Sequence, residues 1–214
     1  MMYKQINMEK WDRLPYYNHY DNIKCRYSLT CVIDISKYML YKEKYNLKLY
    51  PIMLYCLTKC VNQMKEFRYD KIENNVVLHD YLSPAYTVLN DDNTFSVIKT
   101  KYDDNLKIFY ENIMKSIAKY KNSGKIEGNN IDDYTFDVSM LPWINFSSFD
   151  LSIGGGYDYL LPIFTIGKYI KDNEKWKIPL SISVNHKVCD GYHIAMFVKN
   201  FQNLIGSLSY EELI

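Results

Sequence analysis

The sequence predicts an α/β fold in one domain, residues 1–214. A chain of this length can bury a hydrophobic core without support from disulfides or a metal. Hydrophobic residues make up 48% of the chain and charged residues 24%, as in an ordinary globular protein, which argues against long disordered stretches. Along the chain, segments whose apolar residues alternate as in a strand are interspersed with segments whose apolar residues recur at helical spacing. This pattern is typical of the fold class.

Strand patterns are found in both halves of the chain. In residues 28–35, apolar and polar side chains alternate, which predicts a half-buried strand. Residues 75–100 contain three short strand-like runs separated by turn-forming residues, and they predict a β-meander. Further strands are predicted within residues 138–152, 159–170 and 175–186.

Two long helices are predicted before the last strands. Pro51 stands in the first turn of residues 50–67, where the missing N–H of proline costs nothing, and apolar side chains follow as in a buried helix. In residues 103–121, apolar side chains recur at helical spacing, and Gly124 follows near the expected end. The polar residues 122–133 are predicted to form a loop within the domain, because strand patterns lie on both sides.

The composition excludes several kinds of function. A net charge of +1 provides no field that would hold a polyanion, so nucleic acid is not expected as a partner. No run of about 18 apolar residues is present, so no membrane span is expected. The cysteines number five, an odd count, and the start of the chain lacks an apolar signal stretch, which predicts a reducing, cytoplasmic compartment. No cysteine pairs have the spacing of a zinc site, so no metal is expected.

His186, at the end of the predicted strand 175–186, is the candidate for chemistry. Apolar residues alternate there with serines and Asn185, and His186 falls on the apolar side. Asp190 and Gly191 precede an apolar helical stripe, so Asp190 is predicted to cap a helix. A partly desolvated histidine held in such a turn can accept a proton from a substrate hydroxyl. From the residues alone, a hydrogen-bonded core histidine beside a helix cap explains the same pattern.

Three segments, in the same order, resemble the chloramphenicol acetyltransferase family. NHKVCDG, which begins at Asn185, is similar to the family motif of two histidines, three variable residues, aspartate and glycine, with asparagine in place of the first histidine. Residues 141–152 are similar to the family segment with Pro-Trp and Ser-Phe, and residues 162–169 to the strand that follows it. The histidine motif alone also occurs in the acyltransferase core of 2-oxo-acid dehydrogenase complexes. Further similar segments at residues 9–20, 25–35 and 50–68 extend the resemblance over essentially the whole chain.

The resemblance implies a fold, an assembly and a reaction. The fold would be an α+β two-layer sandwich, with a mixed sheet and helices mainly on one face. The assembly would be a homotrimer with active sites at the subunit interfaces. His186 would take the proton from an acceptor hydroxyl, which would attack the thioester of acetyl-CoA directly, with no permanently bound cofactor. Ser148 would donate to the oxyanion, which is worth roughly 3 kcal/mol of barrier; from the residues alone it is one strand serine beside Ser147 and Ser152.

Four further residues receive a role from the resemblance. Thr165 would help to bind the same intermediate through water, and Tyr27 would contact the acceptor. Tyr169 would lie near the adenine of CoA, and Lys168 would meet a CoA phosphate. Each also has an ordinary explanation, since a threonine suits a strand, tyrosines pack in cores and a lysine at a strand end is usually solvated.

Two positions depart from the family pattern. The family's aspartate pairs with an arginine from the N-terminal segment, and aligning residues 25–30 places Tyr20 at that arginine's position, between His19 and Asp21. We therefore expect the ion pair to be missing and Asp190 to depend on capping N–H groups. The second departure, Asn185, points away from the base.

The resemblance predicts acetylation of chloramphenicol by acetyl-CoA and, with it, antibiotic resistance. The two departures keep two alternatives open. One is an acetyltransferase for a different small hydroxylated acceptor. The other is a catalytically weakened or non-catalytic binding protein on the same trimeric fold. His193 is expected to be a surface or interface residue and not a second base.

Overall fold

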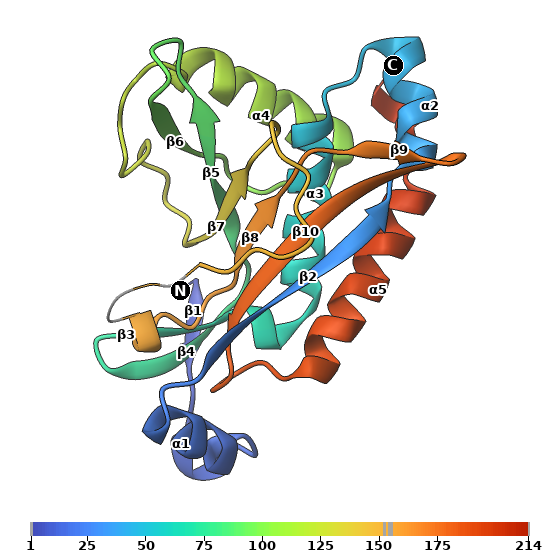
Figure 1. Cartoon of the computed structure of the whole chain (residues 1–214). Helices are drawn as coiled ribbons and strands as arrows, with labels where there is room; N and C mark the ends of the chain where they lie inside the picture. Colours follow the sequence, from blue (N-terminus) through green and yellow to red (C-terminus); the bar gives the residue numbers. More distant parts are fainter. Residues whose placement is uncertain (1, 152, 154–155, 214) are drawn as a thin grey trace.

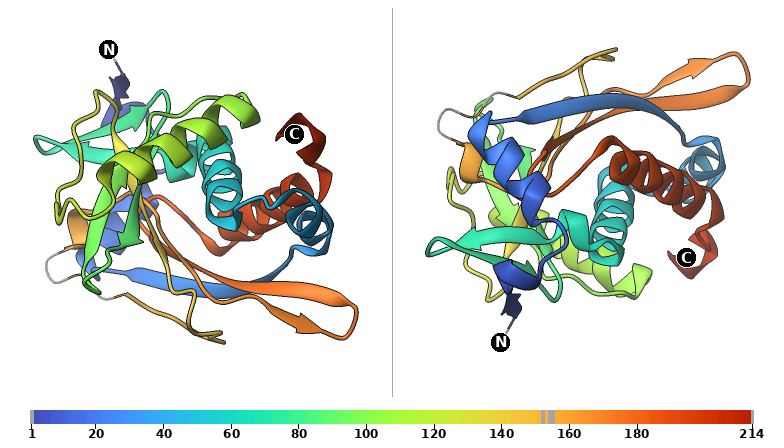
Figure 2. Two further views of the ribbon diagram at one scale, coloured as in Figure 1. Left: turned by 90° about the horizontal axis from the view of Figure 1, so that it is seen from above. Right: turned by 90° about the horizontal axis from the view of Figure 1, so that it is seen from below.

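The computed structural model describes residues 2–151, 153 and 156–213. Helices α2 to α5 lie on one side of a large twisted sheet, whose other face is free of helices (Figures 1 and 2). The helices are α1 (Leu14–Asn22), α2 (Ser36–Tyr45), α3 (Leu49–Gln63), α4 (Leu106–Tyr120) and α5 (Gly191–Ser207). The strands are β1 (Tyr3–Gln5), β2 (Arg26–Asp34), β3 (Tyr69–Ile72), β4 (Asn75–His79), β5 (Ser83–Leu89), β6 (Phe95–Lys99), β7 (Thr135–Met140), β8 (Ile163–Ile166), β9 (Ile170–Asp172) and β10 (Lys175–Asn185).

The larger sheet is mixed, as expected. Its described strands follow the order β2, β10, β8, β7, β5 and β6, and β9 pairs with β10. The pairs β5 with β7 and β7 with β8 are parallel, and the other pairs are antiparallel. The longest ladder joins β10 to β2, from Lys177 opposite Asp34 to Asn185 opposite Arg26. This ladder fixes the position of the residue that follows β10, His186.

The core lies between this sheet and its helices. In β10, Ile178, Leu180 and Ile182 are fully buried in the core cluster, as their alternation predicted. Helix α3 is buried on nearly all sides, which matches its largely apolar sequence. The core cluster includes buried side chains from Ile33 to Tyr210, and partly buried residues nearer the N-terminus pack against it. A single domain over residues 1–214 stays a prediction.

Two strand predictions were wrong. The meander over residues 75–100 is divided between two sheets, because β4 pairs with β1 and β3 in a separate three-stranded sheet and only β5 and β6 form a hairpin. The strand expected at residues 138–152 ends at Met140. Its apolar side chains resemble those of a strand, but the described residues 141–151 form no ladder.

The segment of residues 141–150 crosses the helix-free face of the sheet. The Phe149 N–H donates to Thr30 Oγ1 at 3.1 Å, and Ser181 Oγ donates to the Phe149 carbonyl at 2.8 Å. Ser28 Oγ donates to Asp150 Oδ1 at 2.5 Å. These side chains of β2 and β10 therefore bind the backbone and a carboxylate of the segment and hold it against the sheet.

A close approach at Gly167 fixes the other end of this segment. A Cβ atom at Gly167 would lie 2.6 Å from Pro179 Cγ and 2.8 Å from Phe146 Cε1, nearer than such atoms pack. The Gly167 N–H also donates to the Pro179 carbonyl at 3.0 Å. Only glycine lets Phe146 lie this close to the sheet.

We predict that Gly167→Ala lowers the free energy of unfolding by about 1–3 kcal/mol, because Phe146 and Pro179 must move to admit the methyl group. Urea denaturation measures the change. Gly206→Ala is the matched control: its new Cβ meets nothing within 4 Å, and the residue lies in α5, so stability should rise by about 0.5–1 kcal/mol. If Gly167→Ala were as stable as wild type, the packing of Phe146 and Pro179 against Gly167 would not be tight.

Candidate active site

His186 is the first residue of the turn between β10 and α5. Its N–H donates to the Cys25 carbonyl at 3.1 Å, which continues the β10–β2 ladder by one residue. The turn closes where the Val188 and Cys189 N–H groups donate to the Asn185 carbonyl at 3.1 and 3.0 Å. The His186 side chain is 23% exposed, so a substrate can reach a ring that is largely shielded from water.

The two ring nitrogens of His186 have different surroundings. Nδ1 is buried and lies 3.2 Å from Asp190 Oδ1, without the angle of a hydrogen bond. Nε2 is therefore the nitrogen that remains to meet a substrate hydroxyl. Geometry of this kind suits a general base, whose reacting nitrogen must be accessible while the rest of the ring is fixed.

Arg13 fixes the turn from the opposite end of the chain. Its Nη1 and Nη2 donate to the two carboxylate oxygens of Asp190 at 2.6 and 2.5 Å. Nη2 also donates to the His186 carbonyl at 3.0 Å, and Nε donates to the Lys187 carbonyl at 3.0 Å. The hydrogen bonds from Arg13 hold the pKa of the Asp190 carboxyl below its usual value, so this carboxylate stays ionised.

The expectation of a missing ion pair was wrong. Arg13, at the N-cap of α1, forms the pair with Asp190 that was thought to be lost. Tyr20 lies two turns further along the same helix and does not stand in for an arginine. The error came from aligning the chain on residues 25–30, which does not fix the register of the helix before them.

Two tyrosines enclose the His186 ring. The Tyr20 ring stacks on it with centroids 3.7 Å apart and planes inclined by 8°. The Tyr27 ring lies 4.9 Å away, inclined by 51°, and its hydroxyl donates to the Cys189 carbonyl at 3.4 Å. Burial raises the pKa of Tyr27, so its hydroxyl stays protonated and uncharged. The imidazole therefore has one aromatic ring stacked on it and a second, tilted ring beside it.

The neighbours of the base have structural partners. Asn185 is buried, and its Nδ2 donates to the Tyr157 and Tyr159 carbonyls at 2.8 and 3.2 Å. A histidine could not make both donations from one nitrogen, which explains this departure from the family motif. Asp190 is the N-cap of α5, as predicted, and its N–H donates to His193 Nδ1 at 2.9 Å. His193 thus completes the cap.

Ser148 and Thr165 lie on the other face of the sheet. Thr165, in β8, pairs with Ser181, and paired residues share a face. Ser181 binds the backbone next to Ser148, whose own side chain is exposed. His186 continues the opposite, apolar face of β10. Within one chain the structure therefore brings Ser148 near Thr165 and separates both from His186.

Lys168 and Tyr169 follow β8, at the edge of the segment that carries Ser148. The Lys168 N–H donates to the Ile144 carbonyl at 2.8 Å, and its side chain is exposed. Tyr169 packs edge-on against Trp176, and Lys42 Nζ of α2 lies 5.6 Å from the Tyr169 ring centroid. An aromatic face with cations beside it suits a ligand that carries both a flat base and phosphate groups.

A cavity of about 610 Å³ opens between the sheet and helices α3 and α4. Its lining is mostly apolar and includes Tyr50, Phe95, Met140 and Trp143. A volume of this size is in the range of pockets for small molecules. Since Trp143 belongs to the segment that carries Ser148, the cavity adjoins that part of the chain.

No group of three or more His, Cys, Asp or Glu side chains within the described ranges is placed to hold a metal ion. None of the helices in the described part of the chain is long and apolar enough to span a membrane. All five cysteines have free thiols.

Sequence reasoning missed three contributors to the site. Arg13 was overlooked, the ring of Tyr20 was not expected on the base, and Lys187 was not singled out. The sequence marks Lys187 only by its place between His186 and the apolar Val188, and a lysine that is buried there needs a carboxylate partner. Arg13 carries no such local signal.

We predict that Arg13→Met lowers the free energy of unfolding at pH 7 by about 2–3 kcal/mol, because it removes charge-assisted hydrogen bonds and leaves two carbonyls without their donor. Arg13→Lys should recover only part of the loss, since an ammonium cannot bind the carboxylate and both carbonyls together. Denaturant titration of the three proteins measures this order.

The difference in unfolding free energy between wild type and Arg13→Met should become smaller as the pH falls. The folded-state pKa of Asp190 is lowered, so its contribution is present above its unfolded pKa and is lost as the pH falls through its folded pKa. The stability gap between wild type and Arg13→Met should therefore shrink below about pH 4. A gap that stays constant down to pH 2 would contradict an ionic role for Asp190.

Comparison with known proteins assigns the family. A family model described as chloramphenicol acetyltransferase matches residues 1–202. A chloramphenicol acetyltransferase of Clostridium perfringens is 40% identical over 211 residues, which cover 97% of this chain and 100% of that protein. One from Campylobacter coli is 41% identical over 209 residues, covering 96% and 99%.

A solved chloramphenicol acetyltransferase structure has the same fold. It superposes with a TM-score of 0.83 at 20% identity and covers 95% of this chain and 100% of its own. That likeness confirms the α+β sandwich predicted from the sequence. With the match over residues 1–202 and relatives at about 40% identity along their whole length, this chain belongs to the chloramphenicol acetyltransferase family.

Proposed function

We propose that this protein is an acetyl-CoA-dependent chloramphenicol O-acetyltransferase in which His186 is the general base. The observation that carries the proposal is the fixed, accessible imidazole of His186, with Nδ1 against Asp190 and the carboxylate paired to Arg13. Membership of the family supports the choice of acceptor and of acetyl donor. With antibiotic as acceptor, the biological consequence is resistance.

The proposed reaction is a direct transfer. His186 Nε2 takes the proton of the acceptor hydroxyl as the oxygen attacks the thioester carbonyl, and the carbonyl oxygen becomes an oxyanion. Ser148 donates a hydrogen bond to that oxyanion, assisted by Thr165 through water. Collapse of the intermediate breaks the carbon–sulfur bond, the acetyl ester is released, and the CoA sulfur receives the proton from His186.

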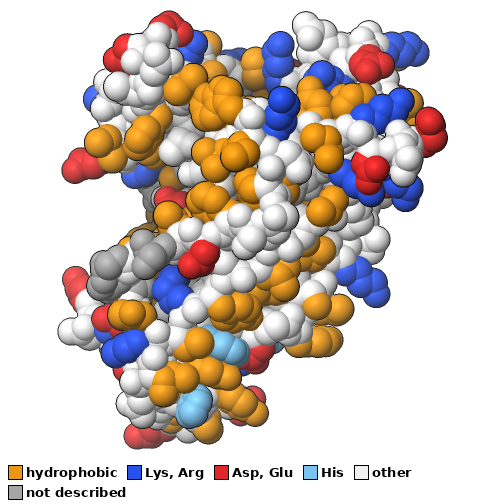
Figure 3. All heavy atoms as spheres, in the orientation of Figure 1, with side chains coloured by type: hydrophobic (Ala, Val, Ile, Leu, Met, Phe, Trp, Pro, Cys, Tyr) orange, Lys and Arg blue, Asp and Glu red, His pale blue; other side chains and the backbone are white. Residues whose placement is uncertain are grey.

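Two copies of the chain are needed for this chemistry. Within one chain, Ser148 and His186 are attached to opposite faces of the sheet, so each site would combine His186 of one copy with Ser148 of another. Exposed apolar side chains lie on the helix-free face: Val32 and Trp143 are each 61% exposed and Ile144 is 55% exposed. Hydrophobic atoms gather over the middle of this face (Figure 3). We assign this face to the interface of a homotrimer.

The substrates would approach from two sides. The apolar cavity beside Phe95 and Trp143 suits the aromatic ring of the acceptor. Tyr169, with Lys42 and Lys168 nearby, suits the adenine and phosphates of CoA. Free thiols and the use of acetyl-CoA fit a cytoplasmic enzyme.

The ion pair between Arg13 and Asp190 weakens the alternative of a non-catalytic protein. That alternative depended on the loss of the arginine, and Arg13 supplies it. The other reason for an altered acceptor, Asn185, has a structural explanation in its contacts with residues 157–159. No observation therefore favours a second function.

Thiol release tests the proposed reaction. Purified protein with acetyl-CoA and chloramphenicol should release free CoA thiol, followed with a chromogenic disulfide reagent, and saturate in chloramphenicol. His186→Ala should lower kcat by about 10²- to 10⁴-fold, as expected on removing a general base. The no-acceptor reaction is the control for hydrolysis. Wild-type turnover by His186→Ala would rule out this base, and no release by wild type would rule out this acceptor.

A mixed-subunit experiment tests the shared site. His186→Ala and Ser148→Ala chains with different tags are co-expressed, and trimers that carry both tags are purified. Each mixed trimer should hold about one intact site in three, so activity should recover far above that of either parent. Mixing His186→Ala with His186→Gln is the control, which should stay inactive. No recovery from the first mixture would mean that Ser148 and His186 do not act together across an interface.

A further inference from the structure

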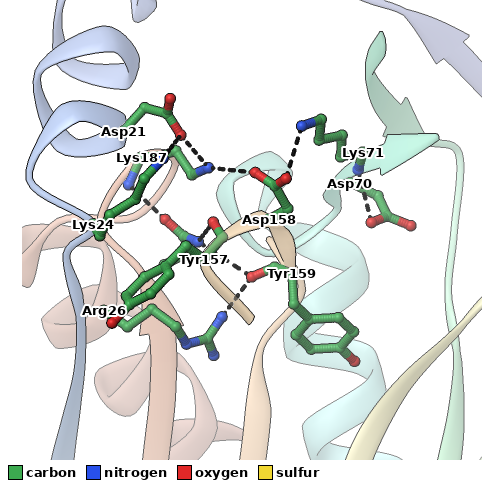
Figure 4. Close-up of polar contacts among 10 residues, drawn as sticks. Asp21, Lys24, Arg26, Asp70, Lys71, Tyr157, Asp158, Tyr159 and Lys187 are labelled. Atoms are coloured by element: carbon green, nitrogen blue, oxygen red, sulfur yellow. Dashed lines mark hydrogen bonds and ion pairs between the residues drawn. The ribbon is translucent and has the colours of Figure 1, made fainter. Parts of the chain in front are cut away.

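A fully buried ammonium group lies next to the base. Lys187 follows His186 directly, and its side chain is 1% exposed. Its Nζ lies 2.7 Å from Asp21 Oδ1 and 3.2 Å from Asp158 Oδ1 (Figure 4). Burying an ammonium costs several kcal/mol unless such partners are present, so the buried position of Lys187 depends on these two carboxylates. Arg13 already holds the backbone of this turn, so the turn itself does not explain Lys187.

The two carboxylates come from different parts of the chain. Asp21 lies in α1, and Asp158 ends the short 3-10 helix Gly156–Asp158 that precedes β8. Lys71 of β3 also pairs with Asp158, at 2.9 Å, so opposite charges alternate along the row Asp21, Lys187, Asp158, Lys71 (Figure 4). The hydrogen bond from Lys187 lowers the pKa of Asp21, which keeps it ionised. Lys187 thus ties two separate segments to the turn of the base.

Asn185, the other neighbour of His186, contacts one of the same segments. Its Nδ2 donates to the Tyr157 and Tyr159 carbonyls, on both sides of Asp158, and its Oδ1 accepts from the Lys187 N–H at 3.0 Å. Both residues that flank the base therefore hold the same loop, and only Lys187 also reaches α1.

Polar contacts hold helix α1 at both ends. None of its residues is fully buried, and its apolar contact with the core is made by the partly buried Tyr17. Arg13 attaches its first turn to the turn of His186, and the pair of Asp21 with Lys187 attaches its last turn. Tyr20, which stacks on the imidazole, is the neighbour of Asp21. The pair of Asp21 with Lys187 therefore holds the part of α1 from which the Tyr20 ring reaches His186.

We propose that Lys187 is a positioning residue for the base: through Asp21 it holds Tyr20 flat against His186, so that Nε2 keeps one direction toward the acceptor hydroxyl. Its kinetic consequence rests on the proposed function of His186. Lys187 contacts neither substrate and does not transfer a proton.

The kinetic test compares two lysines that meet the same aspartate. Lys187→Met should lower kcat/KM for chloramphenicol by about 10- to 100-fold, as for a misdirected reacting group, while the KM for acetyl-CoA changes by less than about twofold. Lys24→Met is the control, because Lys24 Nζ lies 3.5 Å from the same Asp21 Oδ1 but its side chain is 50% exposed. It should stay within about twofold of wild type. Asp21→Asn combined with Lys187→Met should be no slower than Lys187→Met alone, since both break one link.

A spectroscopic readout separates positioning from general stability. The ring current of Tyr20 shifts the His186 ring protons, which can be followed by NMR in histidine-labelled protein, where only four histidines contribute. Tyr20→Leu gives the unstacked position of the signal and His186→Gln identifies it. Lys187→Met should move the signal toward the unstacked position, and Lys24→Met should not. If Lys187→Met fails to fold, Asp21→Asn, which leaves Lys187 paired with Asp158, replaces it in both tests.

The proposal requires both results. An unmoved His186 signal, or an unchanged kcat/KM for chloramphenicol, in Lys187→Met or its replacement would overturn it. If wild type itself does not acetylate chloramphenicol, the proposed function fails, and the NMR signal still decides whether Lys187 positions the stack.

Discussion

Arg13 makes four hydrogen bonds to the turn that carries His186, two of them to the carboxylate of Asp190. A planar guanidinium can bind a carboxylate with two donors and still reach carbonyls to one side, which a lysine cannot do. Arg13 stands at the N-cap position of α1, so these bonds join the start of the first helix to the start of the last. The turn of His186, the carboxylate of Asp190 at the start of α5 and the first turn of α1 are all held together by this one side chain.

The alternation of β10 divides the chemistry between two faces of the sheet. His186 continues the apolar face, while the serine face binds the segment that carries Ser148. Because strand neighbours always point in opposite directions, one chain cannot bring both groups to one substrate. In the proposed function, assembly is therefore part of the active site, and the exposed apolar side chains on the helix-free face are assigned to the interface.

Features that depend on a few neighbouring residues could be predicted from the sequence. The alternation of β10 placed His186 on the apolar face, and the turn sequence placed Asp190 at the start of α5. Arg13 could not be found this way, because it pairs with a residue 177 positions away. The strand expected after Met140 was wrong for a related reason: its backbone bonds to side chains of β2 and β10, which no local pattern encodes.

A crystal structure of the protein with chloramphenicol and CoA would test the account most directly. The account predicts a trimer in which the reacting hydroxyl lies about 2.6–3.2 Å from His186 Nε2 of one copy, with Ser148 of another copy facing the reaction centre. A hydroxyl out of reach of His186, or a site in which His186 and Ser148 of the same chain meet, would contradict it.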